Sequence, residues 1–347
     1  MEAVERQNDE GNRRRLADAD RRLAADPRDL RALIAKGDAL TALGDGRGGA
    51  GFYSCALRYA GDGRGLSPDL IADLRRAQAA AKEQARRFES HLTDSLVAAG
   101  FDPARSSERF AQSLDLMAGR KQLYLSQPLF YLFPGLPQVQ FQPRDTLPWL
   151  DAVEAATADI RAELEALLAE PELFRPYVER RADRPNTDTA GMVDNPEWSA
   201  LYLWKDGVEQ TEVARRCPRT LEALAEVPLC RVPGRTPSIL FSRLKPGARI
   251  PPHHGLINTR LICHLPLIVP PGNRFRVGNE VREWKEGVAW AFDDTVEHEA
   301  RNDGEADRTI LIFDVWKPEL TEEERALVAA MFEAIDAYGA GEANWGV

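Results

Sequence analysis

The sequence has 347 residues, 44% of them hydrophobic and 29% charged, with a formal net charge of −10. This length predicts two domains, and the acidic balance argues against a nucleic-acid partner, which would need a basic face. No stretch approaches the ~20 apolar residues of a membrane span, and the charged N-terminus lacks the apolar core of a secretory signal. The four scattered cysteines show no CxxC pairing, which suits reduced thiols. We therefore expect a cytoplasmic protein.

Residues 10–118 are rich in Ala, Leu, Arg and Glu, a composition typical of consecutive helices. Asp26-Pro27 predicts a break after the first helix, because proline disfavours helical conformation in the residue before it. The second helix is expected to end at Gly44, since glycine tolerates left-handed turns. Further helices are expected over 68–100 and 104–118.

The order of these helices resembles a tetratricopeptide repeat. Gly37 is small enough to let a helix pair pack closely, and Tyr53 and Ala56 stand where the second helix of such a repeat would carry them. The glycine-rich stretch 44–51 indicates an unusually long turn between the two helices. Only one good copy is visible, whereas such arrays normally need about three. A plain helical cap on the second domain is the alternative.

The character of the sequence changes after residue 120. Proline-punctuated residues 120–150 indicate an extended linker laid over the next domain, and a helix is expected over 150–170. From residue 235 onward, short runs of β-branched and aromatic residues bounded by Pro, Gly, Asn or Asp indicate strands of a sandwich or barrel. The segment from Thr321 to Tyr338 returns to a helical pattern with an acidic first turn, which suits the helix dipole.

Histidine is the strongest chemical signal. Only five are present, and four of them lie in the β region: His91, His253, His254, His264 and His298. His253 and His298 each lie at a boundary between a strand and a turn, and a closed sheet would bring them together. Imidazole suits iron, copper, nickel and zinc, and non-haem iron oxygenases use two histidines and a carboxylate.

The segment PSILFSRLKPGARIPPHHGLINTRLICHLPLIVPPGNRFRVGNEVREWKEGVAWAFDDTVEHEARNDGEADRTILIFDVWKPELT resembles the aspartyl/asparaginyl β-hydroxylase domain almost end to end. The upstream pieces FPGLP, WSALYLWKDGVE and RCPRT resemble it as well, so the similarity extends over roughly residues 120–320. It implies an α+β protein: a helical, tetratricopeptide-like domain over 1–118, then a double-stranded β-helix of jelly-roll or cupin-like type over 119–347.

The resemblance also implies the cofactors: iron(II), the cosubstrate 2-oxoglutarate and dioxygen. His253 and His298 match the two iron ligands and are the expected catalytic pair. Gly255 stands where most such oxygenases carry a carboxylate ligand, an absence that is itself a mark of this family. Arg308 and Ser242 match the residues that bind the far carboxylate of 2-oxoglutarate, and guanidinium suits this role because it pairs with carboxylates through two parallel hydrogen bonds.

His264 matches a histidine near the other end of the cosubstrate, and Arg260 is a further expected cosubstrate contact. One position departs from the family pattern: Ile262 stands where the best-known animal members have a second arginine. The pocket therefore loses a charge, which favours a less acidic or differently held substrate.

Several residues have plainer interpretations. His91 lies on a helix among charged residues, and His254 is expected to be a neighbour of the site. Asp293 and Asp294 precede the second histidine and are expected to cap a turn or orient a ligand, with direct metal contact as the alternative. Cys263 should face the core, because adjacent strand residues point to opposite sides.

The implied function is hydroxylation of a C–H bond with release of succinate and carbon dioxide. Helical repeats usually present a concave surface to a peptide, which favours an amino-acid side chain of a protein or peptide as substrate. The alternatives are a small-molecule or lipid acyl hydroxylase, a non-catalytic repeat scaffold, and a cupin-like isomerase or zinc-binding module. The sequence leaves the oligomeric state open.

Overall fold

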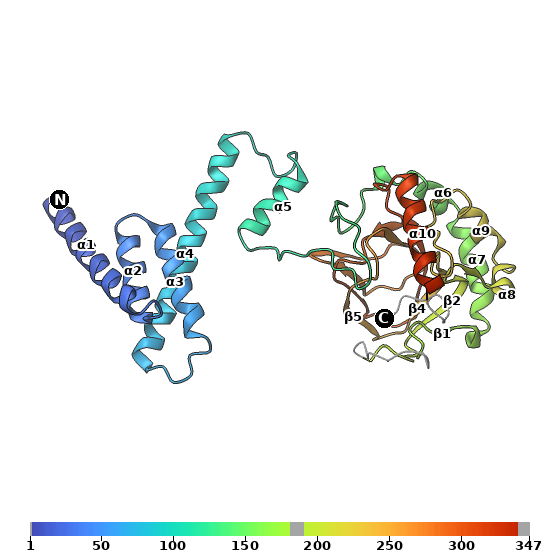
Figure 1. Ribbon diagram of the computed structural model, residues 1–347, viewed down its shortest axis with the longest axis horizontal. Helices are drawn as coiled ribbons and strands as arrows, with labels where there is room; N and C mark the ends of the chain where they lie inside the picture. Colours follow the sequence, from blue (N-terminus) through green and yellow to red (C-terminus); the bar gives the residue numbers. More distant parts are fainter. Residues whose placement is uncertain (1, 181–190, 339–347) are drawn as a thin grey trace. The chain divides into compact units, whose positions relative to one another are not determined.

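The computed structural model describes residues 2–180 and 191–338 (Figure 1). The chain divides into two compact units, Met1–Lys121 and Gln122–Val347. The first is helical and the second holds the sheets, so each is considered by itself.

The first unit consists of helices in the part of the chain that is described. They are α1 (Glu2–Ala25), α2 (Leu30–Ala42), α3 (Gly46–Ala60), α4 (Pro68–Ala98) and α5 (Glu108–Met117). The break at Asp26-Pro27 lies where the sequence predicts it, and the Asp29 side chain caps α2 by accepting a hydrogen bond from the Ala32 N–H. Leu33, Ile34, Tyr53 and Ala56 are among the buried core residues between α2, α3 and α4.

The prediction of a long glycine-rich turn was wrong. The turn ends at Asp45, which caps α3 through the Gly48 N–H, and the following glycines lie inside the helix. A Cβ on Gly37 would overlap the ring of Tyr53, and one on Gly49 would crowd the Gly37 carbonyl. The glycines therefore serve the close approach of α2 to α3 rather than a flexible loop.

The second unit begins with an extended segment and continues into short helices. The expected single helix over 150–170 is two helices, α6 (Leu150–Ala155) and α7 (Thr157–Leu168), which meet at Ala156. Short helices α8 (Thr211–Ala214) and α9 (Pro218–Ala223) follow later, and α10 (Glu322–Tyr338) occupies the predicted C-terminal helical segment.

Two antiparallel sheets form the rest of this unit. The larger has the strand order β1-β2-β4-β11-β6-β9, with β3 paired to β2, and the smaller has the order β5-β10-β7-β8. The larger sheet's strands are β1 (Arg175–Pro176), β2 (Trp198–Lys205), β3 (Val208–Glu209), β4 (Ile239–Leu244), β6 (Arg260–Ile268), β9 (Trp290–Phe292) and β11 (Arg308–Trp316). The smaller sheet's are β5 (Arg249–His253), β7 (Asn273–Val277), β8 (Glu280–Arg282) and β10 (His298–Asn302).

Strands therefore begin well before residue 235, where the sequence predicts their start. β2 pairs with β4 in the larger sheet, with Ala200 opposite Ser242. This pairing partner lies about forty residues further along the chain, so no local pattern reveals it.

Alternation along the strands separates two cores. On β6, Leu261, Cys263 and Leu265 pack with α6 and α7 on the outer face of the larger sheet. Ile262 belongs to the inner core, between the two sheets, together with Ile310 and Ile312 of β11. This arrangement is a double-stranded β-helix, and it confirms the α+β class and the core position of Cys263. Among the described residues, no helix has the length and apolarity needed to cross a membrane.

Candidate active site

The two histidines of the sequence prediction are cross-strand partners. His253 ends β5 and His298 begins β10, and the antiparallel register places them directly opposite each other. Their ring centroids are 4.0 Å apart. Two strand ends distant in sequence thus present a pair of imidazoles on one side of the smaller sheet.

Each ring is oriented by a backbone carbonyl of its own chain segment. His253 Nδ1 lies 2.7 Å from the Pro251 oxygen, and His298 Nδ1 lies 3.1 Å from the Val296 oxygen. Because a carbonyl only accepts, Nδ1 carries the proton in both rings, which leaves each Nε2 lone pair available to a metal. Burial lowers the pKa of His253 and lowers that of His298 well below its usual value, which favours the neutral form that ligates metals.

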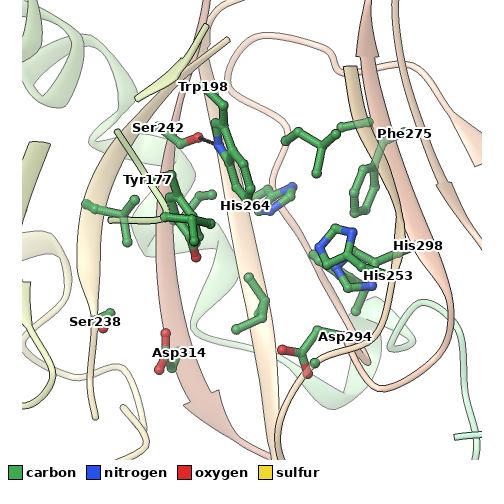
Figure 2. Close-up of a pocket in the computed structure, with 18 of the residues that line it drawn as sticks. Tyr177, Trp198, Ser238, Ser242, His253, His264, Phe275, Asp294, His298 and Asp314 are labelled. Carbon is green, nitrogen blue, oxygen red and sulfur yellow. Dashed lines mark hydrogen bonds between the residues drawn. The ribbon is translucent and has the colours of Figure 1, made fainter. Parts of the chain in front are cut away.

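The histidine pair lies on a cavity of about 580 Å³ between the two sheets. Figure 2 shows Ser242 and Trp198 at one end of this pocket and Asp314 and Asp294 at the other, with the histidine pair between them. Most of the remaining lining is apolar or aromatic. The pocket therefore has two polar ends joined by an apolar middle.

The first end is built around Arg308 at the start of β11. Its side chain is buried, and neither Nε nor one terminal nitrogen has a hydrogen-bond partner. The Trp284 ring lies 4.7 Å from the guanidinium carbon, and burial lowers the pKa of Arg308 to about 9. A buried cation without a carboxylate partner is costly, so this end of the pocket is suited to an anion.

Two further predicted residues accompany this arginine. Ser242 on β4 faces Ile310, the residue two positions after Arg308, so Ser242 and Arg308 are diagonal neighbours across two strands. The Ser242 hydroxyl accepts a hydrogen bond of 3.1 Å from Trp198 Nε1. His264 is buried with an unpartnered Nδ1, and burial followed by the nearby Arg308 charge lowers its pKa well below the usual value.

Arg260 occupies the opposite end and has a different environment. Its guanidinium lies 2.7 Å from Asp314 and 3.4 Å from Asp294. All three residues are buried, and desolvation raises the pKa of Asp294 to about 6 and raises that of Asp314. The structure thus places the two arginines at separate ends of the pocket, one within an ion-pair network and one facing no carboxylate among the described residues.

The two aspartates before His298 point to different places. Asp293 accepts from Lys317 at 2.6 Å in a fully buried ion pair and also from Thr295. Asp294 lies on the pocket, and its carboxylate fills the space that a Cβ on Gly255 would need. In the described ranges 2–180 and 191–338, no group of three or more His, Cys, Asp or Glu gathers as a metal cluster.

The donor set would suit a metal ion held by the two imidazoles, with an anion bound beside it. Two neutral imidazoles leave several coordination positions open, as an oxygenase iron requires. An unpaired arginine, a serine hydroxyl and an unsatisfied histidine nitrogen lie on the same cavity and suit the two carboxylates of a keto diacid. His254 also lines the pocket, whereas His91 lies on α4 in the helical unit.

Sequence reasoning missed several lining residues. Tyr177 stacks on Trp198 with centroids 3.9 Å apart, and Phe275 and Phe292 surround His264 and His298. Trp284 is buried and contacts Arg308. The other missed residue, Asp314, had a visible signal, because a lone carboxylate in the apolar run of β11 must find a buried partner.

The second unit is therefore a double-stranded β-helix with a histidine pair facing the cavity between its sheets. The family model described as aspartyl/asparaginyl beta-hydroxylase matches residues 154–318, which contain every predicted site residue. The second unit is thus similar to this hydroxylase family over most of its length.

Curated relatives agree with this placement. Mouse aspartyl/asparaginyl beta-hydroxylase is 38% identical over 139 residues, covering 39% of this chain and 18% of the relative. The ornithine lipid ester-linked acyl 2-hydroxylase of Rhizobium tropici is 35% identical over 181 residues, covering 50% and 59%. The chain thus spans less than two thirds of these relatives. The Schizosaccharomyces pombe Cnp3 cupin domain matches at 9% identity with a TM-score of 0.24, covering 35% of this chain and 66% of that one.

Proposed function

We propose that the protein is an iron(II)- and 2-oxoglutarate-dependent dioxygenase that hydroxylates a C–H bond and releases succinate and carbon dioxide. The observation that carries the proposal is the buried, unpaired Arg308 on the same cavity as the histidine pair. His253 and His298 would hold the iron through Nε2. When bound, iron and 2-oxoglutarate supply the oxidising chemistry, with dioxygen as oxidant.

The chain's own residues would bind and orient the cosubstrate and shield it from water. Arg308 and Ser242 would hold the far carboxylate of 2-oxoglutarate, and His264 would contact its other end. The aromatic wall of Phe275, Phe292 and the tryptophans keeps water from the reacting centre. Arg260, which the sequence predicts as a cosubstrate contact, pairs with Asp314 and Asp294. We propose that it lies at the substrate end of the pocket.

The pocket favours a substrate that is not acidic at the reacting carbon. Ile262 and Ile312 form an apolar wall between the two ends, and the charge of Arg260 is balanced by Asp314 and Asp294. A second carboxylate would therefore meet no uncompensated cation there. We propose an amino-acid side chain of a protein or peptide, presented with the help of a tetratricopeptide-like helical unit.

A second candidate is hydroxylation of a small molecule or a lipid acyl chain. The largely apolar middle of the cavity and the similarity to an acyl 2-hydroxylase favour it. A non-catalytic scaffold and a cupin-like isomerase or zinc module are less favoured, because neither needs an unpaired arginine beside the histidine pair. Among the described residues, no carboxylate pairs with Arg308, and this favours the two hydroxylase proposals over the scaffold and cupin-like alternatives.

The test is anaerobic addition of iron(II) and 2-oxoglutarate to the purified chain. We expect the weak visible charge-transfer band of the chelated cosubstrate, lost in both His253→Ala and Arg308→Ala. Succinate release in air would then serve to screen peptides against acyl lipids. Metal binding without the band would overturn the cosubstrate assignment and favour the cupin-like alternative.

A further inference from the structure

One extended segment reaches both turns that carry the histidines. Residues 126–133, termed the strap, run along the edge of the site within the second unit. The Gln127 N–H donates to the Thr295 carbonyl at 2.7 Å, just before the second histidine. The Leu129 N–H donates to the Gly255 carbonyl at 2.9 Å, just after the first histidine. Three consecutive residues thus connect two turns that are far apart in sequence.

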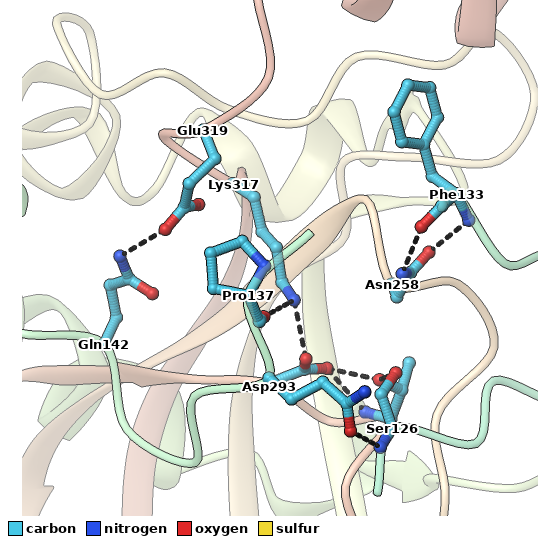
Figure 3. Close-up of polar contacts among 10 residues, drawn as sticks. Ser126, Phe133, Pro137, Gln142, Asn258, Asp293, Lys317 and Glu319 are labelled. Carbon is cyan, nitrogen blue, oxygen red and sulfur yellow. Dashed lines mark hydrogen bonds and ion pairs between the residues drawn. The ribbon is translucent and has the colours of Figure 1, made fainter. Parts of the chain in front are cut away.

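The first end of the strap is anchored in a buried polar network. The Ser126 and Thr295 hydroxyls lie 2.6 Å apart, and the Thr295 hydroxyl donates to Asp293 at 2.5 Å. Asp293 pairs with Lys317, whose ammonium also lies 3.5 Å from the Pro137 carbonyl (Figure 3). Because both charges are buried and paired, this network provides a fixed base rather than a solvated contact.

The second end is anchored by a single buried amide. The Asn258 side chain accepts from the Phe133 N–H at 2.6 Å and donates to the Phe133 carbonyl at 2.9 Å (Figure 3). Nearby, the rings of Phe130 and Tyr131 lie 5.9 and 5.6 Å from that of Phe332 on α10. The strap is therefore fixed on both sides of the residues that contact the ligand turns.

We propose that the strap is a positioning element for the metal site: it sets the separation of the two histidine turns, and so the metal affinity, without contacting the metal. This inference rests on the proposed function for its metal readout. Its physical basis is that a site with only two protein ligands depends on how well they are held in place beforehand. The direct link between the turns, from the Gly255 N–H to the Asp294 carbonyl at 2.6 Å, would share this task.

The chain offers a matched control. Asn279 makes the same two hydrogen bonds with the backbone of Gln122, at 3.0 and 2.6 Å. It follows Gly278, whose N–H donates to the Glu297 carbonyl beside His298, so it serves as the control for the turn that follows His253. Asn258→Ala and Asn279→Ala therefore remove the same kind of contact from neighbouring parts of one segment. Ser126→Ala, which deletes one hydroxyl at the other anchor, keeps the test available if Asn258→Ala does not fold.

Two readouts on the full chain decide the proposal. In the metal-free protein, we expect Asn258→Ala and Ser126→Ala to speed hydrogen exchange at both 254–257 and 293–297, and Asn279→Ala to leave 254–257 unchanged. With manganese(II) as probe, we expect the dissociation constant to rise about tenfold in the first two variants only, measured at a temperature where the melting curve shows each metal-free variant to be folded.

Equal effects from Asn279→Ala, or faster exchange confined to the strap itself, would overturn the proposal. If the unaltered protein bound no manganese(II), the proposed metal centre would fail, while the exchange comparison would still decide whether the strap positions the turns.

Discussion

The two ends of the pocket each contain a buried arginine, and their surroundings are opposite. Arg260 lies between Asp314 and Asp294. Burial lowers the pKa of Arg260, but the two carboxylates raise it by more, so the pKa is raised overall. Arg308 meets a tryptophan face and a serine-lined strand, and burial lowers its pKa to about 9. Asp314 and Asp294 neutralise the charge of Arg260 within the folded chain. Arg308 has no carboxylate partner among the described residues, so its charge remains available to bind an anion. The comparison identifies which end is built for a ligand.

The largest expected effect is on stability at the paired end. Asp314→Ala removes the closer carboxylate, 2.7 Å from Arg260, and leaves a buried guanidinium with the more distant Asp294. Breaking a buried pair from one side costs about 3–5 kcal/mol, so we expect the free energy of unfolding in urea to fall by that amount. An unchanged unfolding midpoint would show that the two ends do not differ as described.

The unpaired end should behave in the reverse way. Arg308→Gln removes a buried charge that faces no carboxylate, so the cosubstrate-free protein should gain about 1 kcal/mol or more. The same change should weaken 2-oxoglutarate binding by about 2–3 kcal/mol, since a charge-assisted pair is lost. Calorimetric melting with and without 2-oxoglutarate measures both quantities. A loss of stability in the free protein would indicate an anionic partner for Arg308.

A smaller effect is expected where the paired end meets the histidines. A Cβ on Gly255 would overlap the Asp294 carboxylate and push it away from Arg260. Gly255→Ala should therefore cost about 1–3 kcal/mol, as overpacking in a dense site does. The exposed Gly51→Ala, where a Cβ has open space and the backbone φ is not positive, as at Gly255, controls for the added methyl group alone. A cost no greater than this control would rule out the clash with Asp294.

The smallest effect near neutral pH concerns the protonation of Arg308. Its pKa lies at about 9, so the guanidinium stays charged at pH 7 and loses its proton as the pH rises through 9. Binding of the 2-oxoglutarate dianion needs the charged form. Affinity should hence be nearly flat up to pH 8 and fall about tenfold per pH unit above 9. Tryptophan fluorescence of the metal-free protein can follow it, because Trp284 contacts Arg308; a profile still flat at pH 10 would contradict this assignment.

Local patterns predicted a large part of this fold. The apolar runs that became β4, β6 and β11 stand out because they are buried on both faces. The start of the strands was predicted too late, since β2 is stabilised by pairing with a strand about forty residues away. The glycines of α3 were misread for a similar reason: the packing against Gly37 that explains them is a tertiary contact.

Several residues of the candidate site could likewise be predicted, but their tertiary contacts could not. The resemblance pointed to the two histidines, Arg308, Ser242 and His264, and the structure brings all five to one cavity. The pairing of Arg260 could not be predicted from the sequence, because its carboxylate partners lie 34 and 54 residues away. Strand register decides which buried charges pair with each other. Register depends on two strands at once, so no single segment of the sequence predicts it.

The direct opposition of His253 and His298 has a mechanical consequence. A metal bound by both would act as a cross-link between an edge strand of the smaller sheet and its neighbour. Because the two ligands come together only when these strands are paired, metal binding would stabilise the paired strands. Fraying of β5 and release of the metal would then be one event, and the lifetime of the metal would measure how firmly that edge is held.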